Sequence, residues 1–404
     1  MNIVTINHYA GSPALGMEYR PYYLAREWVR LGHRVQMLAA DFSHVRSLQP
    51  LAGDEKIDGI DYRFYPTPRY RGNGLGRAWN IWRFLRQVWG DTQRVVRDFA
   101  PHVVIASSTY PLDIWVARRM ARAARAKLVF EVHDLWPLSP VELAGMPRWH
   151  PFIMLCQAAE DAAYRDADAV VSMLPKVHAY MASRGLAQGK LHIVPNGITL
   201  EEWLGEGPPL RDDVVQVLQA AQRAGRTVVG YAGSHGLPNA LDTLLDAAQL
   251  LRDHAIQFVL VGDGHEKARL AQRVAGESLT NVSLLPPIPK AQIPALLRAL
   301  DIAYIGWQRM PIYRFGIAPN KLMDYMMAGC AVLHSVEAGN DPVAEAGCGI
   351  TVQPQAPAAV AEGLLRLTEI GADARRAMGE RGRAFVLANH TYPVLAQRFL
   401  EAAK

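Results

Sequence analysis

The stretch that decides the fold is DIAYIGWQRMPIYRFGIAPNKLMDYMMAGCAVLHSV, residues 301–336. It begins and ends with short apolar runs, DIAYIG and AVLHSV, which have the length and composition of buried β-strands. Between them, residues 320–328 carry apolar side chains at helical spacing, with Pro319 just before and Gly329 just after. The stretch therefore predicts a strand–helix–strand unit, the repeating element of a parallel α/β sheet.

The same alternation runs through the rest of the chain. Nearly continuous apolar character predicts strands covered on both faces, at residues 1–6, 34–40, 102–108, 127–132, 169–174, 192–195, 227–233, 258–264 and 282–288. Helical patterns lie between them, for example at residues 18–31, 112–126, 239–252, 265–275 and 290–299. Repeated strand–helix units of this kind predict doubly wound parallel sheets.

The length of 404 residues exceeds what one ordinary core accommodates, so two domains are expected. The Gly- and Pro-containing segment 195–210 reads as the linker. We therefore expect two Rossmann-like domains, residues 1–200 and 205–385, and a terminal helix within 386–404 that packs back on the N-terminal domain. Ligands of such sheets bind at the carboxyl ends of the strands, which predicts a site in the cleft between the domains.

Composition narrows the class of protein. Half of the residues are hydrophobic and 20% are charged, and the net charge is +5, a mild basicity that favours phosphates or an anionic membrane surface as partners. No nucleic-acid recognition motif accompanies the charge, which disfavours DNA binding. The three scattered cysteines suggest neither a disulfide framework nor a metal site and fit a reducing cytosol. Without a signal-peptide pattern or a bilayer-length apolar run, we expect a cytoplasmic protein with at most peripheral membrane contact.

Two groups of residues follow strands of the first half. Gly11 and Gly16 follow the first strand, and a helix expected to begin near Met17 offers free N–H groups to a polar or anionic ligand. The spacing is not GxGxxG, so no dinucleotide site is indicated, and a flexible loop is the alternative. His133 and Asp134 follow strand 127–132, where α/β enzymes place catalytic groups. Alternatively, Asp134 caps a turn and His133 packs beside it.

The second half places small residues at the ends of two strands. Gly233 and Ser234 follow one, and Gly262 and Gly264 follow the other. Small residues let a ligand approach the backbone. Together these positions predict a nucleotide site, although each glycine alone is also compatible with an ordinary turn.

The helix at 320–328 adds polar groups to that site. Its first N–H groups, at Asn320 to Leu322, suit a diphosphate, and Lys321 adds a positive charge. Asp324, about one turn further, suits the hydroxyl groups of a ribose. The alternative is that Lys321 and Asp324 are a solvated pair on the helix surface, which contributes only a few tenths of a kcal/mol.

The ordered set VPNGI (194–198), YAGS (231–234), FVLVGDG (258–264) and PNKLMDYMMAGCAV (319–332) resembles the family 4 glycosyltransferases with the GT-B fold. It is most similar to bacterial members of the WbuB type, which act in surface-polysaccharide assembly. The resemblance covers nearly the whole chain. It implies a retaining, metal-independent hexosyl- or N-acetylhexosaminyl-type transferase whose C-terminal domain holds a nucleotide-sugar donor, expected to be a UDP-sugar. The N-terminal domain would hold the acceptor, and no cofactor is implied.

The residues depart from the family pattern at two places. That pattern has two glutamates eight positions apart. The second, which binds ribose, falls on Asp324, whereas the first, which contacts the donor sugar, falls on Gly316. An Arg and a Lys that meet the diphosphate fall on Ser234 and Asn239. We expect Lys321, with Arg314 or Arg309, to supply the missing positive charge, because phosphate requires charge and not a particular chain position.

The resemblance also gives His133 a place close to the donor sugar, in a front-face mechanism where the leaving diphosphate helps deprotonate the acceptor. Protein groups then act by positioning and by stabilising the leaving group. Two alternatives remain open: a sugar-nucleotide epimerase of the same architecture, and a nucleotide-sugar-binding subunit that has lost activity, as the missing Glu and the missing Arg/Lys pair would allow.

Residues 69–99 predict a basic helix rich in tryptophan. On a helical wheel Trp79 and Trp82 share one side with Leu85 and Trp89, while arginines that include Arg83 and Arg86 gather on another. Such a helix suits an anionic bilayer, here the inner face of the cytoplasmic membrane, and a lipid-linked acceptor would give it a reason to lie there. The alternative is a domain helix with its apolar side in the core.

Overall fold

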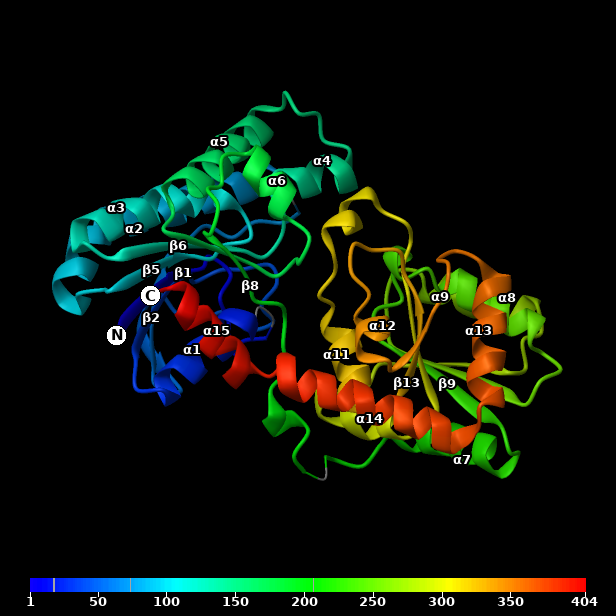
Figure 1. Cartoon of the computed structure of the whole chain (residues 1–404). Coiled ribbons are helices and arrows are strands. Elements are labelled where there is room, and N and C mark those ends of the chain that lie inside the picture. The colour runs from blue at the N-terminus through cyan, green and yellow to red at the C-terminus, as the bar shows by residue number, and fades with distance from the viewer. Residues whose placement is uncertain (17–18, 73, 206) are drawn as a thin grey trace. The chain divides into compact units, whose positions relative to one another are not determined.

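The computed structural model describes residues 1–16, 19–72, 74–205 and 207–404 (Figure 1). The chain forms two compact units. The first comprises Met1–Asn196 together with Tyr392–Lys404, and the second comprises Gly197–Thr391. Within the described ranges, no helix combines the length and the apolar character needed to cross a bilayer.

The first unit is built on an eight-stranded sheet in the order β3-β4-β2-β1-β5-β6-β7-β8. All neighbouring strands are parallel except β3, which is antiparallel to β4 at the edge. The strands are β1 (Asn2–Ile6), β2 (Arg34–Ala40), β3 (Gly53–Ile57), β4 (Ile60–Tyr65), β5 (Val103–Ala106), β6 (Lys127–Val132), β7 (Ala169–Ser172) and β8 (Leu191–Ile193).

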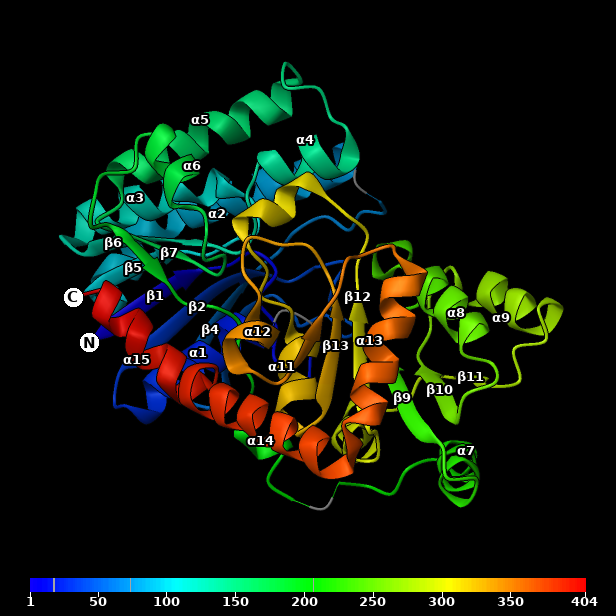
Figure 2. The ribbon, with the colours of Figure 1, turned by 45° about the vertical axis from the view of Figure 1, so that its right-hand side comes forward.

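Helices cover this sheet, and the last helix of the chain is one of them. Figure 2 shows α15 beside α1, and the indole N–H of Trp28 in α1 donates to the carbonyl of Ala396 in α15 at 3.1 Å. The Trp28 and Phe399 rings pack 5.1 Å apart. The predicted return of the C-terminal helix is therefore confirmed. The helices are α1 (Tyr19–Arg30), α2 (Leu75–Phe99), α3 (Ile114–Ala124), α4 (Leu138–Ala144), α5 (Pro151–Asp166), α6 (His178–Ser183) and α15 (Tyr392–Ala402), and a short 3-10 turn spans Pro111–Asp113.

The second unit has a six-stranded, fully parallel sheet in the order β11-β10-β9-β12-β13-β14. Its strands are β9 (Thr227–Ala232), β10 (Ile256–Val261), β11 (Val282–Leu285), β12 (Ile302–Gly306), β13 (Ala331–Ser335) and β14 (Gly349–Thr351). The central β9 has β10 on one side and β12 on the other. The chain order therefore reverses beside β9, the topological switch point where doubly wound sheets bind ligands.

Two separate apolar cores cover the two faces of this sheet. One packs α7, α10, α11 and part of α14 against the strands, and the other packs α8, α9 and α13. In Figures 1 and 2, α13 and α8 lie together on one side of the strands and α11 and α14 on the other. The helices are α7 (Asp212–Arg223), α8 (Leu241–Leu250), α9 (Lys267–Gly276), α10 (Ile293–Arg298), α11 (Asn320–Met327), α12 (Pro342–Ala346), α13 (Pro357–Glu369) and α14 (Gly371–Asn389), and 3-10 turns span Leu200–Glu202, Leu237–Asn239, Lys290–Gln292 and Pro311–Phe315.

The predicted strands all form, and no end is shifted by more than three residues. Sequence reasoning missed the β3–β4 hairpin and β14. The residues of β3, GDEKI, are polar and mostly exposed, so they lack the apolar run that marked the other strands. The strand β14 has only three residues and forms because it pairs with β13.

Candidate functional site

In the second unit, α11 is held against the end of β9 by an aromatic side chain. Tyr325 is buried, and its hydroxyl accepts a hydrogen bond from the Ala232 backbone N–H at 3.0 Å. The apolar face of α11, which includes Leu322 and Met326, lies in the core. Gly329, at φ +78°, ends the helix and turns the chain into β13. This packing brings the first turn of α11 beside the loop that follows β9.

The Lys321 side chain lies under that loop. Its Nζ donates to the hydroxyl of Tyr231 at 2.7 Å and to Oδ1 of Asn239 at 3.2 Å, and it sits 4.1 Å from the centre of the Tyr231 ring. Among the described residues, none of its contacts is a carboxylate. Burial lowers the pKa of Lys321 to about 7. The solvated pair with Asp324 is therefore not what forms. Lys321 is instead a desolvated ammonium group without a neutralising partner.

Gly233 lies beside this ammonium group, and the other two strand-end glycines pack near it. A Cβ atom built on Gly233 would lie 2.9 Å from Nζ of Lys321, and the φ of +147° at this position strains any residue with a side chain. A Cβ atom on Gly262 would overlap the carbonyl oxygen of Gly233, and one on Gly264 would overlap the backbone of His235. The two strand-end loops thus pack directly on each other. Ser234 is exposed, and its carbonyl accepts from Tyr231 and Asn239.

Three residues beside Lys321 were not predicted as part of the site. Tyr231 and Asn239 hold its Nζ, and His235 is fully buried beside the same loops. Neither ring nitrogen of His235 has a hydrogen-bond partner among the described residues, and burial, with Lys267 nearby, lowers its pKa to about 4. Tyr231 opens the quoted YAGS stretch and His235 directly follows it, but the sequence does not show where their side chains point.

Asp324 is the other charged group of α11. Its side chain is half-buried. Burial raises its pKa to about 7, and the charge of Lys290 opposes the rise. Asn320 is exposed at the helix start. The side chain of Leu322 is fully buried, so Leu322 can offer a ligand its backbone N–H but not its side chain.

The loop before α11 carries Arg314 and Gly316. Arg314 is exposed, donates to the carbonyl of Pro311 at 2.6 Å and stacks on the Phe315 ring at 4.2 Å. Gly316 has φ +97°, a conformation that strains any residue with a side chain. The side chain of Asn340 clamps the next residue, because its Oδ1 accepts from the Ile317 N–H at 2.7 Å. This loop therefore has a fixed backbone that favours glycine at position 316.

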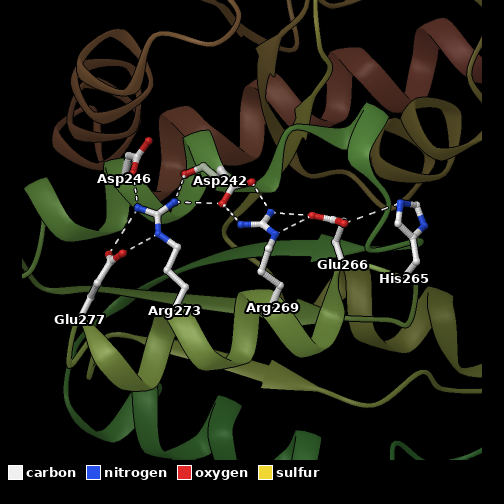
Figure 3. A network of polar contacts seen from close by, with 7 residues as sticks. All are labelled: Asp242, Asp246, His265, Glu266, Arg269, Arg273 and Glu277. Carbon is white, nitrogen blue, oxygen red and sulfur yellow. Dashed lines mark hydrogen bonds and ion pairs between the residues drawn. The ribbon is translucent and has the colours of Figure 1, made fainter.

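An ion-pair network joins α8 and α9, the helices that follow the loops after β9 and β10 (Figure 3). Asp242 in α8 accepts from Arg269 and Arg273 in α9, and Arg269 also pairs with Glu266 at 2.7 Å. The backbone N–H of Glu266 donates to the carbonyl of His235 at 3.0 Å. Isolated surface pairs contribute little, but a bidentate network of this kind holds its members in one geometry. It braces the loop after β10 against the loop after β9.

In the first unit, His133 lies at the end of β6 within a buried polar cluster. Its Nε2 is 3.0 Å from Oγ of Ser107 and 3.4 Å from Oε2 of Glu131. Glu131 also accepts from Nε of Arg20 at 2.9 Å, and both side chains of this ion pair are almost fully buried. Burial favours the neutral acid, but the charges of His133 and Arg20 outweigh it and lower the pKa of Glu131 to about 2.

Arg20 extends this cluster along the sheet edge. Its Nη atoms donate to the carbonyls of Val194 at 2.8 Å and Pro195 at 2.6 Å, beyond the end of β8. One side chain of α1 thereby joins the ends of β6 and β8. The charge cluster fixes the ring of His133 through Glu131, so the imidazole is a positioned group. Sequence reasoning missed Arg20 because its partners lie more than a hundred residues away in the chain.

Asp134 makes the contacts of a turn cap. Its Oδ1 accepts from the Leu135 N–H at 2.9 Å and from the Ser139 hydroxyl at 2.6 Å. These contacts match the alternative given in the sequence analysis, in which Asp134 caps a turn. His8 is fully buried and bonded through Nδ1 to the Tyr110 hydroxyl at 2.5 Å, and burial lowers its pKa to about 3. No described contact joins His8 to His133, since β5 lies between β1 and β6.

The loop after β1 is tightly packed at Gly16. A Cβ atom on Gly16, at φ +89°, would overlap the side chain of Ser47, whose backbone N–H donates to the carbonyl of Leu15. The expected helix start near Met17 lies outside the described residues, and α1 is described from Tyr19. Gly16 therefore permits a close backbone contact within the first unit, and its place near a donor remains a prediction.

The side of helix α2 that packs in the core is not the side that carries its tryptophans. Ile81, Phe84 and Val88 are in the core, while Trp79 is 53% exposed and Trp82 44% exposed. The two indoles stack with centroids 4.7 Å apart, and the guanidinium of Arg86 lies over Trp82 at 5.1 Å. Arg83 is half-buried on the same helix. The sheet therefore does not cover the aromatic side of α2.

No group of three or more His, Cys, Asp or Glu side chains with the geometry of a metal site occurs in the described part of the chain. The positive charge beside the loops after β9 and β10 comes from Lys321 and from Lys267, whose Nζ donates to the carbonyl of Gly262 at 2.6 Å, while the arginines of α9 engage carboxylates. The geometry thus offers a diphosphate a cation and glycine-lined backbone, and it offers a ribose a half-buried carboxyl group.

Comparisons with protein families agree with this geometry. A family model described as "Glycosyl transferase 4-like domain" matches residues 16–197, and one described as "Glycosyl transferases group 1" matches residues 226–369. The chain belongs to the group 1 glycosyltransferases of family 4. The first match lies in the unit that holds His133, and the second in the unit that holds Lys321 and Asp324.

Two curated relatives are distant members of the same family. The putative colanic acid biosynthesis glycosyl transferase WcaI of Escherichia coli is 22% identical over 253 residues, which are 61% of each chain. The probable glycosyltransferase WbjE of Pseudomonas aeruginosa is 22% identical over 271 residues, which are 66% of each chain. The chain thus spans a little less than two thirds of the length of the relatives it matches.

Solved structures show the fold. Sucrose-phosphate synthase from Thermosynechococcus elongatus matches with a TM-score of 0.72 and 17% identity, covering 99% of this chain and 98% of that one. HepE of Anabaena, solved with UDP-glucose, matches with a TM-score of 0.64 and 16% identity over the same shares of the two chains. The predicted GT-B fold is therefore confirmed.

The Arg20–Glu131 pair generates a stability prediction. Glu131→Gln leaves the Arg20 cation buried without its counter-charge, which is expected to lower the free energy of unfolding by roughly 3 kcal/mol at neutral pH. The folded-state pKa of Glu131 is depressed from its ordinary 4.5 to about 2, so its contribution is present above pH 4.5 and is lost as the pH falls towards 2. Urea denaturation across this range measures both effects.

Glu55→Gln on the exposed edge strand β3 is the matched control, and it should leave the unfolding curves almost unchanged. Equal stability of Glu131→Gln and the unsubstituted chain at neutral pH would contradict the assigned role of the pair.

Proposed function

We propose that the chain is a retaining glycosyltransferase that moves a sugar from a nucleotide-sugar donor to a glycan or lipid-linked acceptor in bacterial surface-polysaccharide synthesis. The observation that carries this proposal is the half-buried Lys321 ammonium beside Gly233, whose described contacts include no carboxylate. A desolvated cation of this kind is costly without an anion. A donor diphosphate supplies that anion, and Asp324 on the same helix faces the ribose.

The donor is expected to be a UDP-sugar that carries a hexosyl or N-acetylhexosaminyl group. HepE, which shares the fold, was solved with UDP-glucose, and the names of WcaI and WbjE connect them with glycosyl transfer. Backbone N–H groups at Gly233, Ser234, Gly262, Gly264 and the start of α11 would contact the phosphates, with Arg314 adding charge from the preceding loop. No metal is required in this arrangement.

In the first unit, His133 is the side chain proposed to act at the donor sugar. Its Nε2 is fixed by Ser107 and Glu131, so the ring is oriented before a substrate arrives. The glycosidic bond to the diphosphate breaks while the acceptor hydroxyl forms the new bond on the same face of the sugar. The acceptor proton passes to the leaving diphosphate, and Lys321 stabilises the charge on that diphosphate. Asp134 contributes by holding the turn that follows His133.

The first test is a panel of nucleotide sugars with and without lipid-linked and free glycan acceptors. We expect acceptor-dependent release of a nucleoside diphosphate, measured by coupled assay. Lys321→Ala should weaken donor binding about tenfold to a hundredfold, because a charge-assisted contact of 1.5–3 kcal/mol is lost. Arg252→Ala, an exposed cation of the same unit, is the control and should bind the donor normally.

The outcomes separate the candidate functions. Conversion of the nucleotide sugar without diphosphate release would indicate an epimerase, and binding without turnover would indicate a binding subunit. Unchanged donor affinity in Lys321→Ala would remove Lys321 from the proposed diphosphate site.

The pKa values near 7 of Lys321 and Asp324 predict a bell-shaped pH dependence of donor binding. The diphosphate is bound by the Lys321 cation, whose population falls as the pH rises through about 7. The ribose is bound by the Asp324 carboxylate, whose population falls as the pH drops through about 7. Binding of the intact nucleotide sugar, measured calorimetrically from about pH 5.5 to 8.5, should be tightest near neutrality.

Single variants should each flatten one side of this curve. Lys321→Ala should lose the alkaline decline and Asp324→Asn the acidic decline, while both bind more weakly than the unsubstituted chain. A pH curve of unchanged shape in both variants would show that other groups set it.

The aromatic side of α2 predicts binding to anionic bilayers. Vesicles that contain anionic lipid should pellet the protein, and high salt should weaken the binding, because arginine charge and buried indole area both contribute. The double substitution Trp79→Ala and Trp82→Ala should reduce the pelleted fraction several-fold, whereas Gln93→Ala on the same helix should not. Failure to pellet with anionic vesicles at any salt concentration would contradict this prediction.

A further inference from the structure

The first unit contains a cavity of about 570 Å³ between the start of α2 and the region of α4. Most of its lining is apolar, and it includes Ile81, Trp136, Leu143 and Phe152. The volume is in the range of sites that enclose a small molecule. The polar side chains of the lining make hydrogen bonds within the protein: Arg77 to Tyr9, Ser139 to Asp134, and the backbone N–H of Phe152 to His150.

The cavity adjoins the group proposed to act at the donor sugar. Asp134 and Trp136 line both this cavity and a smaller recess that is also lined by His133. The turn that Asp134 caps, through Leu135 and Ser139, therefore forms a shared wall. This wall separates the cavity from the recess by the residues that directly follow His133 in the chain.

The other side of the cavity opens beside the aromatic side of α2. Leu75 lines the cavity and is 90% exposed, and Leu143 lines it and is 48% exposed. Trp79 is adjacent to the lining residue Ala78 in the chain and is exposed as well. Arg77 also lines the cavity, and its Nε donates to the Tyr9 hydroxyl at 3.1 Å, so a guanidinium group is fixed at an otherwise apolar wall.

We propose that this cavity binds the hydrocarbon portion of a lipid-linked acceptor whose anionic head group lies at Arg77. This inference rests on the proposed transferase function and names the acceptor class for it. The apolar lining removes the chain from water, and the guanidinium of Arg77 meets a phosphate group. The wall of Asp134 and Trp136 that the cavity shares with the recess of His133 puts the bound lipid beside the turn that follows His133.

The test uses alkyl phosphates of increasing length as probes, below their micelle concentrations and without any nucleotide sugar. Calorimetry should show one equivalent bound, with dodecyl phosphate at least about a hundredfold tighter than hexyl phosphate, because each buried methylene strengthens binding about fourfold. Inorganic phosphate should bind too weakly to measure.

Two variants of α2 make the test specific. Ala78→Trp fills the mouth of the cavity and should abolish the dependence of affinity on chain length. Gln93→Trp places the same side chain on the exposed surface of the same helix, away from the cavity lining, and should retain that dependence. Circular dichroism and the melting temperature of each variant verify that both fold.

Three outcomes would overturn the inference: affinity independent of chain length, identical behaviour of the two variants, or uptake of many probe molecules without saturation, which indicates surface adsorption to α2. The proposed function fails separately, through absence of nucleotide-sugar binding in the second unit. Retained donor binding with length-independent alkyl phosphate binding would leave a transferase that uses a soluble glycan acceptor.

Discussion

The constraint on which the second unit depends is the burial of the Lys321 ammonium group. Desolvating a cation is expensive, and the chain offers only the hydroxyl of Tyr231, the amide oxygen of Asn239 and an aromatic face in return. The first unit treats its buried cation differently, because Arg20 is neutralised by Glu131. The Arg20 charge is therefore neutralised within the protein, whereas the half-buried Lys321 ammonium has no carboxylate among its described contacts. This asymmetry is the reason why the proposed function places an anionic ligand at Lys321.

The fold was largely predictable, because parallel strands buried on both faces leave long apolar runs in the sequence. The sequence did not predict strands that form through pairing with a neighbour and lack an apolar pattern of their own, such as the polar edge strand Gly53–Ile57. Helix α2 shows a second limit. Its pattern revealed an aromatic side that includes Trp79 and Trp82, but periodicity does not reveal which side meets the sheet. Ile81 and Phe84 occupy that position, and the indoles remain in solvent.

The residues of the candidate site also fall into those predictable from local sequence and those that depend on long-range packing. Lys321, Asp324 and the strand-end glycines were predictable, because helix starts and strand ends are local features and the geometry of a parallel sheet brings them together. Their partners were not. Tyr231 lies 90 residues before Lys321, and Pro195 lies 175 residues after Arg20. Contacts over such separations depend on the packing of α1 and α11, which a single sequence does not specify at the level of side-chain direction.

Gly316, where the sequence departs from the family pattern, also depends on the packing of the chain around it. The loop is fixed by the positive φ of Gly316 and by the hydrogen bond from the Ile317 N–H to Asn340. A glutamate at position 316 would be strained in this backbone conformation. Gly339 closes the loop from the other side, because its N–H donates to the carbonyl of Tyr313. Glycine at position 316 is therefore tied to the shape of this loop. A glutamate there would have to adopt this backbone conformation as well as add a charge, whereas Lys321 and Asp324 stand on α11, beyond the loop.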